Sequence, residues 1–331
     1  MEKQIIVGIT IGDPNGIGPE IIIKTFNDNR LLDFITPVIY SPKNIIKDYV
    51  DLLQCSVDFK IINNLKNIKN KNLYVFDIPD KSFKISPGKN CKEAGEISFK
   101  SLELATESMI KNQLDVIITA PINKSNIQNK SFDFKGHTEY FTSLANVEHS
   151  LMLMVHQGLR VALVTNHLPL KNISNALNDT LIKDKARLFN NSLIKDFGIQ
   201  RPKIALLGLN PHCSDDGLIG NEERDIIIPA IEQLNKEGLL VYGPFPTDGF
   251  FANGAYQKFD GILAMYHDQG LAPFKIISQN LGVNFTAGLP IIRTSPDHGT
   301  AYNIAGNGIA DENSFRNAIY TAIDIYKKRR N

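Results

Sequence analysis

The sequence predicts an α/β protein built on a mainly parallel sheet. Short apolar runs rich in valine, isoleucine and leucine alternate with longer segments of helical period, which is the pattern of repeated strand–helix units. The runs are apolar without alternation, as expected of strands that helices cover on both faces. A chain of 331 residues, 43% of them apolar, is long enough for a large core, and we expect two lobes rather than one.

The predicted strands are short apolar runs bounded by turn-forming residues. In chain order they are Ile5–Ile11, Pro37–Tyr40, Leu73–Asp77, Asp115–Thr119, Leu151–Val155, Val161–Val164, Lys203–Leu209 and Gly261–Tyr266. The predicted helices carry the helical apolar period, and the first has Pro19 in its opening turn, a favoured position for proline. They are Gly18–Phe26, Glu93–Lys111, Asn178–Phe197, Glu222–Lys236 and Asn313–Lys328. The Asn/Lys-rich residues 63–72 are expected to form a surface loop.

Two turn-rich segments, residues 120–129 and 286–296, are the predicted crossings between the lobes. The division that follows assigns residues 1–125 and 295–331 to a first α/β lobe, which holds a glycine-rich turn. Residues 126–294 form a second α/β lobe, which holds most of the candidate site residues.

Composition and charge exclude several classes of protein. Lys plus Arg is 36 and Asp plus Glu is 35, without the basic excess of a nucleic-acid-binding protein. The three cysteines form no CxxC pair, which favours a reduced compartment. The first residues contain too short an apolar run for a signal peptide, and no run approaches the roughly 20 residues of a membrane span. We therefore expect a cytoplasmic protein that binds neither nucleic acid nor membrane.

Three of the seven histidines share one position relative to a predicted strand. His167 follows VALVTN, His212 follows IALLGLNP, and His267 follows ILAMY. Because ligands bind at the carboxyl edge of a parallel sheet, three imidazoles placed there can converge on one metal ion. The alternative is that each is an ordinary hydrogen-bonded loop histidine. An all-nitrogen ligand set suits Zn²⁺ or Co²⁺, and Asp268 or water as further ligands would admit Mg²⁺ or Mn²⁺.

A glycine-rich turn, GDPNGIGPE, follows the first predicted strand. Gly12, Gly16 and Gly18 would let backbone N–H groups approach the anionic part of a cofactor at the start of the next helix. The turn is not GxGxxG and lacks the acidic residue of the dinucleotide fingerprint, so no Rossmann fold is predicted. A tight structural turn explains the glycines equally well.

Several polar residues are candidates for binding an anionic substrate. His137 and Thr138 lie in GHTEY, and Asn284 lies in GVNFTAGLP. Lys275 and Arg293 follow apolar, glycine-containing segments where a surface charge is not expected. Two cations beside a metal ion would suit a substrate that carries both a phosphate and a carboxylate.

Taken together, eight motifs resemble those of the 4-hydroxythreonine-4-phosphate dehydrogenase family of vitamin B6 synthesis. They run from residue 8 to about residue 310, and jointly they are far more specific than any one of them. The motifs are GDPNGIGPE, PINK, GHTEYF, NHLPL, LNPH, YHDQGLAPFK, GVNFTAGLPIIRTSPDHGTAY and IAGNGIA.

This resemblance implies a homodimer with an isocitrate-dehydrogenase-like α/β/α fold, two lobes and a site in a cleft at the dimer interface. It implies metal ligation by His167, His212 and His267. It also implies binding of NAD or NADP without a GxGxxG motif, and a divalent metal (Zn, Mg or Co). The implied substrate contacts are His137, Thr138, Lys275, Asn284 and Arg293. By the same resemblance, the second lobe would provide the dimer contacts.

The implied reaction is the oxidation of 4-phosphohydroxy-L-threonine to 2-amino-3-oxo-4-phosphooxybutanoate, which decarboxylates to 3-amino-2-oxopropyl phosphate. The general base is left open between Asp268, Asp248 and Lys275. The alternative substrate is a related four-carbon sugar-acid phosphate, threonate or erythronate 4-phosphate. The alternatives outside this class are a non-catalytic metal-binding scaffold and a metal-dependent phosphohydrolase, which would normally use more carboxylate ligands.

Overall fold

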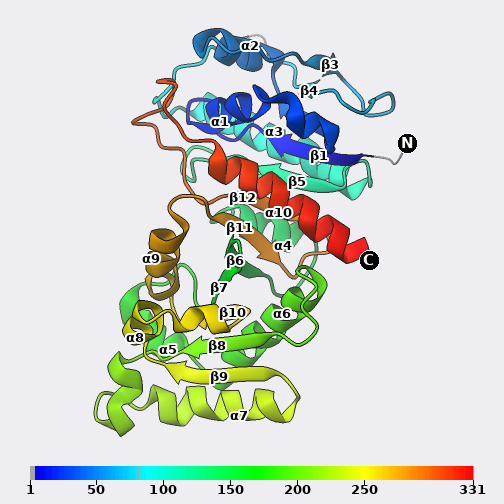
Figure 1. Cartoon of the computed structure of the whole chain (residues 1–331). Helices are drawn as coiled ribbons and strands as arrows, with labels where there is room; N and C mark the ends of the chain where they lie inside the picture. Colours follow the sequence, from blue (N-terminus) through cyan, green and yellow to red (C-terminus); the bar gives the residue numbers. More distant parts are fainter. Residues whose placement is uncertain (1–3, 81, 331) are drawn as a thin grey trace. The chain divides into compact units, whose positions relative to one another are not determined.

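The computed structural model describes residues 4–80 and 82–330, which form two compact units (Figure 1). The described residues of Met1–Asn146 and Pro290–Tyr326 make up unit 1, and those of Val147–Leu289 and Lys327–Asn331 make up unit 2. Residues 126–146 and 290–294, which the predicted division assigns to the second lobe, lie in unit 1, and residues 327–330, assigned to the first lobe, lie in unit 2. In unit 1 the ring of Phe132 contacts those of Phe99 and Tyr140.

Unit 1 contains parallel strands in the order β3-β4-β2-β1-β5-β12. Their β-branched and aliphatic residues are buried almost throughout, as expected of central strands. The strands are β1 (Ile5–Thr10), β2 (Ile35–Ser41), β3 (Lys60–Ile62), β4 (Tyr74–Asp77), β5 (Val116–Thr119) and β12 (Arg293–Pro296).

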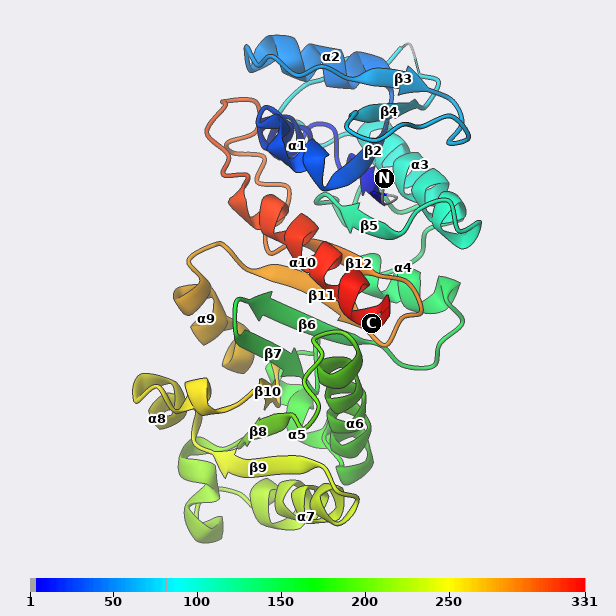
Figure 2. The ribbon, with the colours of Figure 1, turned by 45° about the vertical axis from the view of Figure 1, so that its right-hand side comes forward.

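Helices cover this sheet. The helix α3 packs on β1, β2 and β5, while α1 packs against α2, and Figure 2 shows α1 and α3 on opposite sides of the strands. The helices of unit 1 are α1 (Gly18–Phe26), α2 (Lys43–Leu52), α3 (Lys92–Ile110), α4 (His137–Leu144) and α10 (Asn313–Arg330), with a short 3₁₀ turn at Asn29–Asp33.

Unit 2 contains strands in the order β11-β6-β7-β10-β8-β9. The strand β6 is antiparallel to both of its neighbours, whereas β7, β10, β8 and β9 run parallel. The strands are β6 (Leu151–His156), β7 (Leu159–Leu163), β8 (Lys203–Leu207), β9 (Leu240–Phe245), β10 (Gly261–Ala264) and β11 (Val283–Ala287).

The helices α9 and α6 lie on opposite faces of the unit 2 strands (Figure 2). A buried apolar cluster fills the α9 side and includes Met154, Val161, Leu207, Ile262 and Phe274. The helices are α5 (Ile173–Ala176), α6 (Asp179–Lys195), α7 (Ile228–Lys236), α8 (Thr247–Ala252) and α9 (His267–Ser278). Short 3₁₀ segments lie at Leu170–Asn172 and Ala255–Lys258, one π-helical turn lies at Glu223–Ile227, and the turns of Pro211–Gly217 have left-handed φ angles from His212 to Asp216.

The predicted α/β class with mainly parallel strands is confirmed, and each predicted strand is present within two residues of its expected bounds. Residues 286–296, the second predicted crossing, contain the boundary between the units at Leu289 and Pro290, but they are not a continuous loop, because they include the last two residues of β11 and all of β12. The sequence RTSP of β12 is fully buried but has no apolar run to reveal it. Among the described helices, none is long and apolar enough to cross a membrane.

Candidate functional site

The three strands that precede the candidate histidines are neighbours in unit 2. The strand β10 lies between β7 and β8, and all three run parallel. His167, His267 and His212 follow the carboxyl ends of β7, β10 and β8 respectively. The chain therefore presents all three imidazoles from one edge of one sheet, the edge where parallel sheets bind ligands.

The rings of His167 and His267 lie together, with their centroids 5.8 Å apart. Two imidazoles that bind one cation through metal–nitrogen bonds of about 2.0–2.1 Å have ring centres roughly 5 to 6 Å apart. His267 Nδ1 lies 2.7 Å from Asp268 Oδ1. A carboxylate that accepts the Nδ1 proton leaves the Nε2 lone pair available, as in the carboxylate–histidine–metal arrangement of many metalloproteins.

His212 lies in a strained loop after β8. Five successive residues, His212 to Asp216, have positive φ angles between 45° and 70°. Each residue in this left-handed region costs about 1–2 kcal/mol when it is not glycine, and such strain is typical of functional sites. Residues 4–80 and 82–330 contain no group of three or more His, Cys, Asp or Glu side chains that could hold a metal ion. The described chain thus pairs His167 with His267 and leaves His212 outside the pair.

The chemistry of this donor set fits a divalent metal. Two imidazoles, one of them oriented by a carboxylate, are the ligands that Zn²⁺ and Co²⁺ accept while keeping positions open for a substrate. The three-histidine ligand set stays a prediction.

The three candidate bases all lie in unit 2. Asp268 is 84% exposed and already contacts His267. Asp248 lies in the first turn of α8, and its charge is one of the causes that raise the pKa of Cys213, the residue after His212. Burial is the main cause of that rise, to about 11, with Glu223 as the next, so Cys213 is a thiol rather than a thiolate ligand at neutral pH. Lys275 is exposed near the end of α9.

Two amide oxygens in unit 2 are buried without a hydrogen-bond partner in the described part of the chain. One is Oδ1 of Asn284 on β11, a predicted substrate contact. The other is Oδ1 of Asn166, which directly precedes His167 and which the sequence analysis did not select. Because buried polar atoms are normally paired, both oxygens point to a polar ligand.

Two further predicted substrate residues, His137 and Thr138, lie in unit 1 at the start of α4. His137 opens this helix, and its Nε2 is buried without a partner among the described residues. Burial holds the pKa of His137 well below its usual range, and the charges of Arg293 and Lys124 lower it further. Thr138 follows His137 in the first turn.

Arg293 is the largest buried cation of this region. It is 2% exposed, and its guanidinium donates to the hydroxyl of Thr119 at 2.7 and 3.0 Å. Burial lowers its pKa to about 9, an effect that Glu139 opposes. A desolvated guanidinium beside a neutral imidazole and the start of a helix is an environment that an anion would stabilise. Lys124, in the motif PINK, belongs to the same environment and was missed because a lone lysine gives little signal.

The glycines of the β1–α1 turn are explained by close packing within unit 1. A Cβ atom at Gly12, Gly16 or Gly18 would lie within 3 Å of a carbonyl oxygen of the chain. Gly12 also has a φ of +69°, which favours glycine. The buried carboxylate of Asp13 fixes the turn by accepting hydrogen bonds from the Asn15 N–H and the Tyr302 hydroxyl. The cofactor contact predicted for these glycines stays a prediction.

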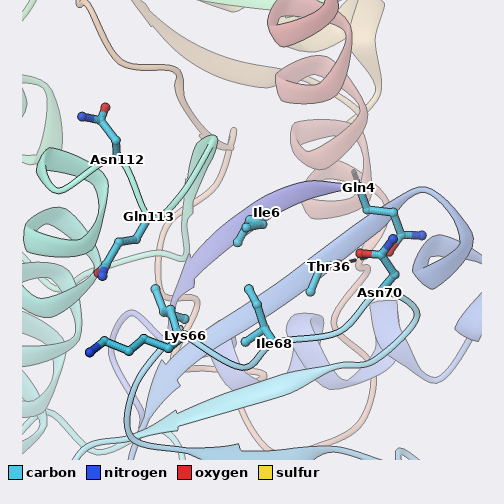
Figure 3. A pocket seen from close by; sticks show the side chains of 9 residues that line it. Gln4, Ile6, Thr36, Lys66, Ile68, Asn70, Asn112 and Gln113 are labelled. Atoms are coloured by element: carbon cyan, nitrogen blue, oxygen red, sulfur yellow. Dashed lines mark hydrogen bonds between the residues drawn. The ribbon is translucent and has the colours of Figure 1, made fainter. Parts of the chain in front are cut away.

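Two cavities in unit 1 lie away from the predicted residues. A groove of about 400 Å³ opens at the amino ends of β1 and β2 and is lined by Gln4, Ile6 and Thr36 together with Asn112 and Gln113 (Figure 3). Its Gln4 amide is already bonded to the Thr36 hydroxyl and to backbone groups. The second cavity, of about 480 Å³, lies beside the start of α3. Neither cavity is lined by any predicted site residue.

Comparison with known proteins gives one consistent family. The model of the family "Pyridoxal phosphate biosynthetic protein PdxA" matches residues 33–322. The chain is 47% identical to a 4-hydroxythreonine-4-phosphate dehydrogenase of Bacteroides thetaiotaomicron, over 99% of this chain and 90% of that protein. It is 37% identical to an Oceanobacillus iheyensis protein named "Putative D-threonate 4-phosphate dehydrogenase", over 98% and 99% of the two chains. The crystal structure of a 4-hydroxythreonine-4-phosphate dehydrogenase from Klebsiella pneumoniae matches with a TM-score of 0.85 at 33% identity, over 98% of both chains.

Proposed function

The chain belongs to the pyridoxal phosphate biosynthetic protein PdxA family, and we propose that it is an oxidoreductase acting on 4-phosphohydroxy-L-threonine. Bound NAD or NADP would supply the acceptor for the hydride that leaves the secondary alcohol, while the hydroxyl proton would pass to a base. The product, 2-amino-3-oxo-4-phosphooxybutanoate, is a β-keto acid that loses CO₂ to give 3-amino-2-oxopropyl phosphate. The observation that carries the proposal is the 47% identity, over nearly the whole chain, to a relative named for this reaction.

We assign phosphate binding to the surroundings of His137 and Arg293 in unit 1. The buried guanidinium supplies fixed donors that match phosphate geometry. His137 is neutral at pH 7 because its pKa is lowered by burial and nearby cations, so its ring can donate one hydrogen bond without adding charge. Thr138, in the same first turn, can add a hydroxyl donor.

We assign metal binding to His167, His212 and His267 in unit 2. A divalent cation held there supplies Lewis-acid stabilisation of the negative charge that develops on the substrate during oxidation and decarboxylation. Asp268 orients the ring of His267, which favours Asp248 or Lys275 as the proton acceptor. The orphaned oxygen of Asn284 can accept a hydrogen bond from a donor group of the substrate, such as its amine or hydroxyl.

We also propose that the chain is a homodimer whose contacts involve unit 2. Large exposed apolar side chains of unit 2 lie in the segments that carry the predicted ligands: Leu168 (42% exposed) and Leu170 (74%) follow His167, Leu218 (82%) follows the His212 loop, and Ile276 (76%) lies on α9. A second subunit that covered these side chains would remove apolar area from water, which favours association. A second subunit would exclude water from the site, which strengthens its electrostatic interactions.

The second candidate substrate is D-threonate 4-phosphate, favoured by the 37% identity to the Oceanobacillus iheyensis protein. The two substrates differ in carrying an amine or a hydroxyl beside the reacting alcohol. The same phosphate and metal residues serve both.

The deciding experiment measures NAD(P)H formation at 340 nm with each substrate, each cofactor, and with or without a chelator. We expect turnover of 4-phosphohydroxy-L-threonine that the chelator abolishes and that added Zn²⁺, Co²⁺ or Mg²⁺ restores. Faster turnover of threonate 4-phosphate would transfer the assignment to the second candidate. Full activity in the chelator would refute the metal assignment.

A further inference from the structure

We propose that the buried carboxylate of Glu223 is a positioning residue that holds His212 at the metal site. This inference rests on the metal assignment above and adds a residue that touches neither metal nor substrate. Glu223 is 2% exposed and opens the π-helical turn that precedes α7. A carboxylate so deeply buried needs several hydrogen bonds to remain charged.

Glu223 accepts those bonds from the loop that carries His212. Its Oε1 accepts the backbone N–H groups of Leu209 and Asn210, both at 2.7 Å. Its Oε2 accepts the Asn210 side-chain amide at 2.9 Å and the Ser214 hydroxyl. One carboxylate therefore binds the chain on both sides of His212.

These hydrogen bonds stabilise a loop whose backbone is neither an ordinary right-handed helix nor a strand. The five residues from His212 to Asp216 are left-handed, a conformation that surrounding structure must impose on residues other than glycine. Glu223 fixes the loop at Asn210 and Ser214, so the strained backbone is held where it enters and within its turn. Without the carboxylate, the loop would relax toward ordinary φ angles and carry the imidazole with it.

Gly208, which follows β8, leaves space for the Glu223 carboxylate because it has no side chain. A Cβ atom at Gly208 would lie 3.1 Å from Glu223 Oε1 and 2.8 Å from Cys213 Sγ. A side chain at this position would push the carboxylate away from the Leu209 and Asn210 N–H groups.

A buried amide ties the same segment to the base of α9. Gln269 donates to the Gly208 carbonyl and accepts from the Met265 N–H at 2.6 Å. Because His267 opens α9 and Gly208 precedes the loop, this amide fixes the two histidine-bearing segments relative to each other. A displacement of the loop at Glu223 would therefore move His212 relative to His267.

The test measures Co²⁺ binding, followed by its visible absorption and by calorimetry, in the full-length wild type and in variants. Glu223→Gln keeps the shape of the side chain but can place an N–H donor opposite the Asn210 side-chain amide, which is itself a donor. We expect a 10- to 100-fold weaker Co²⁺ affinity, the usual effect of losing a group that orients a metal ligand, with a changed absorption spectrum. The value of kcat should fall more than KM changes. Ser214→Ala, which removes one of the bonds, should give a smaller change of the same kind.

Asp196→Asn is the matched control. Asp196 is also a 2%-exposed carboxylate of unit 2, and it accepts bonds from the Ser192 hydroxyl and from Arg329 Nε, at 2.6 and 2.7 Å. This variant should lower the melting temperature and leave the Co²⁺ affinity within about 2-fold of wild type.

His212→Ala distinguishes a failure of the positioning role of Glu223 from a failure of the metal assignment. If His212→Ala weakens Co²⁺ binding and Glu223→Gln does not, the positioning role is wrong and the metal assignment stands. Loss of affinity in Asp196→Asn equal to that in Glu223→Gln would show a general effect of destabilisation and would also refute the positioning role. If His212→Ala binds Co²⁺ as the wild type does, the metal assignment fails and the role of Glu223 fails with it.

Discussion

Among single residues, Arg293 and His137 form the candidate anion site of unit 1, since Arg293 is 2% exposed and the Nε2 atom of His137 is buried. Both groups are positive or can become positive, and both have pKa values lowered mainly by burial. An anion would relieve the desolvation of each. The pair should therefore bind phosphate even without the rest of a substrate.

Replacement of Arg293 tests this anion site. Arg293→Met should remove the increase in melting temperature that inorganic phosphate gives the wild type. It should also raise KM for the phosphorylated substrate roughly 10- to 100-fold, since hydrogen bonds to charged groups contribute about 1.5–3 kcal/mol. Thermal unfolding at several phosphate concentrations measures the first effect. Arg187→Met, at a half-exposed arginine of unit 2, is the control that should keep the phosphate response.

The lowered pKa of His137 predicts a pH dependence of stability. In the unfolded chain the imidazole binds a proton near pH 6.5, whereas the folded protein keeps it neutral to a much lower pH. Below pH 6.5 the unfolded state binds more protons, so the free energy of unfolding falls by up to about 1.4 kcal/mol per pH unit from this group. Urea unfolding between pH 7.5 and 5.5 should show a shallower decline for His137→Asn than for the wild type. Parallel curves for the two proteins would contradict the buried neutral state.

Among the elements of unit 1, the β1–α1 turn is packed closely against the backbone of other segments. The β1–α1 turn is held by the Asp13 N–H, which donates to the Pro121 carbonyl, and by the Ile17 N–H, which donates to the Thr300 carbonyl. The turn therefore joins three segments that are distant in sequence.

Substitution in this turn should be costly. Gly12→Ala would place a Cβ atom 2.4 Å from the Pro121 oxygen at a residue with positive φ. We expect a loss of about 2–4 kcal/mol in the free energy of unfolding, measured with urea. Gly158→Ala is the control, because nothing lies within 4 Å of its Cβ position, and it should change stability by less than about 1 kcal/mol. Equal effects would show that the close approach is relieved by small backbone movements.

For the molecule as a whole, the proposed dimer would cover exposed apolar side chains of unit 2, including Leu218. Leu218→Asp should convert the dimer to a monomer in sedimentation velocity and lower kcat at least 10-fold. Ile309→Asp, at a 66%-exposed residue of unit 1, should leave the dimer intact. A wild-type protein that sediments as a monomer would refute the proposal.

The fold class could be predicted because buried parallel strands are apolar along their whole length. This signal revealed β1, β2, β5 and β10, and it failed where burial was achieved by polar side chains. The buried Arg293, Thr294 and Ser295 of β12 are an example. The helix α9 was also missed, since it opens with HDQG and contains Pro273.

The candidate site could be predicted in part, for a related reason. A histidine directly after an apolar run is visible in sequence, and the run itself predicts the edge of the sheet that it reaches. The residues that hold these histidines are not visible in this way. Glu223 stands beside another glutamate at the start of a helical period and reads as a solvated surface charge. Its burial depends on Gly208 and on the loop between them, which only the folded chain brings together.

The strand β10 lies between β7 and β8 but follows both in the sequence, so it can join them only after both have been synthesised. The bond from the Thr165 hydroxyl to the Met265 carbonyl joins positions 100 residues apart, and Gln269 reaches back 61 residues to Gly208. Closing such long loops costs entropy, which slows the formation of these contacts. A nascent chain on the ribosome that ends before His267 lacks one of the two paired imidazoles, so the proposed metal site would form only after the start of α9 has emerged.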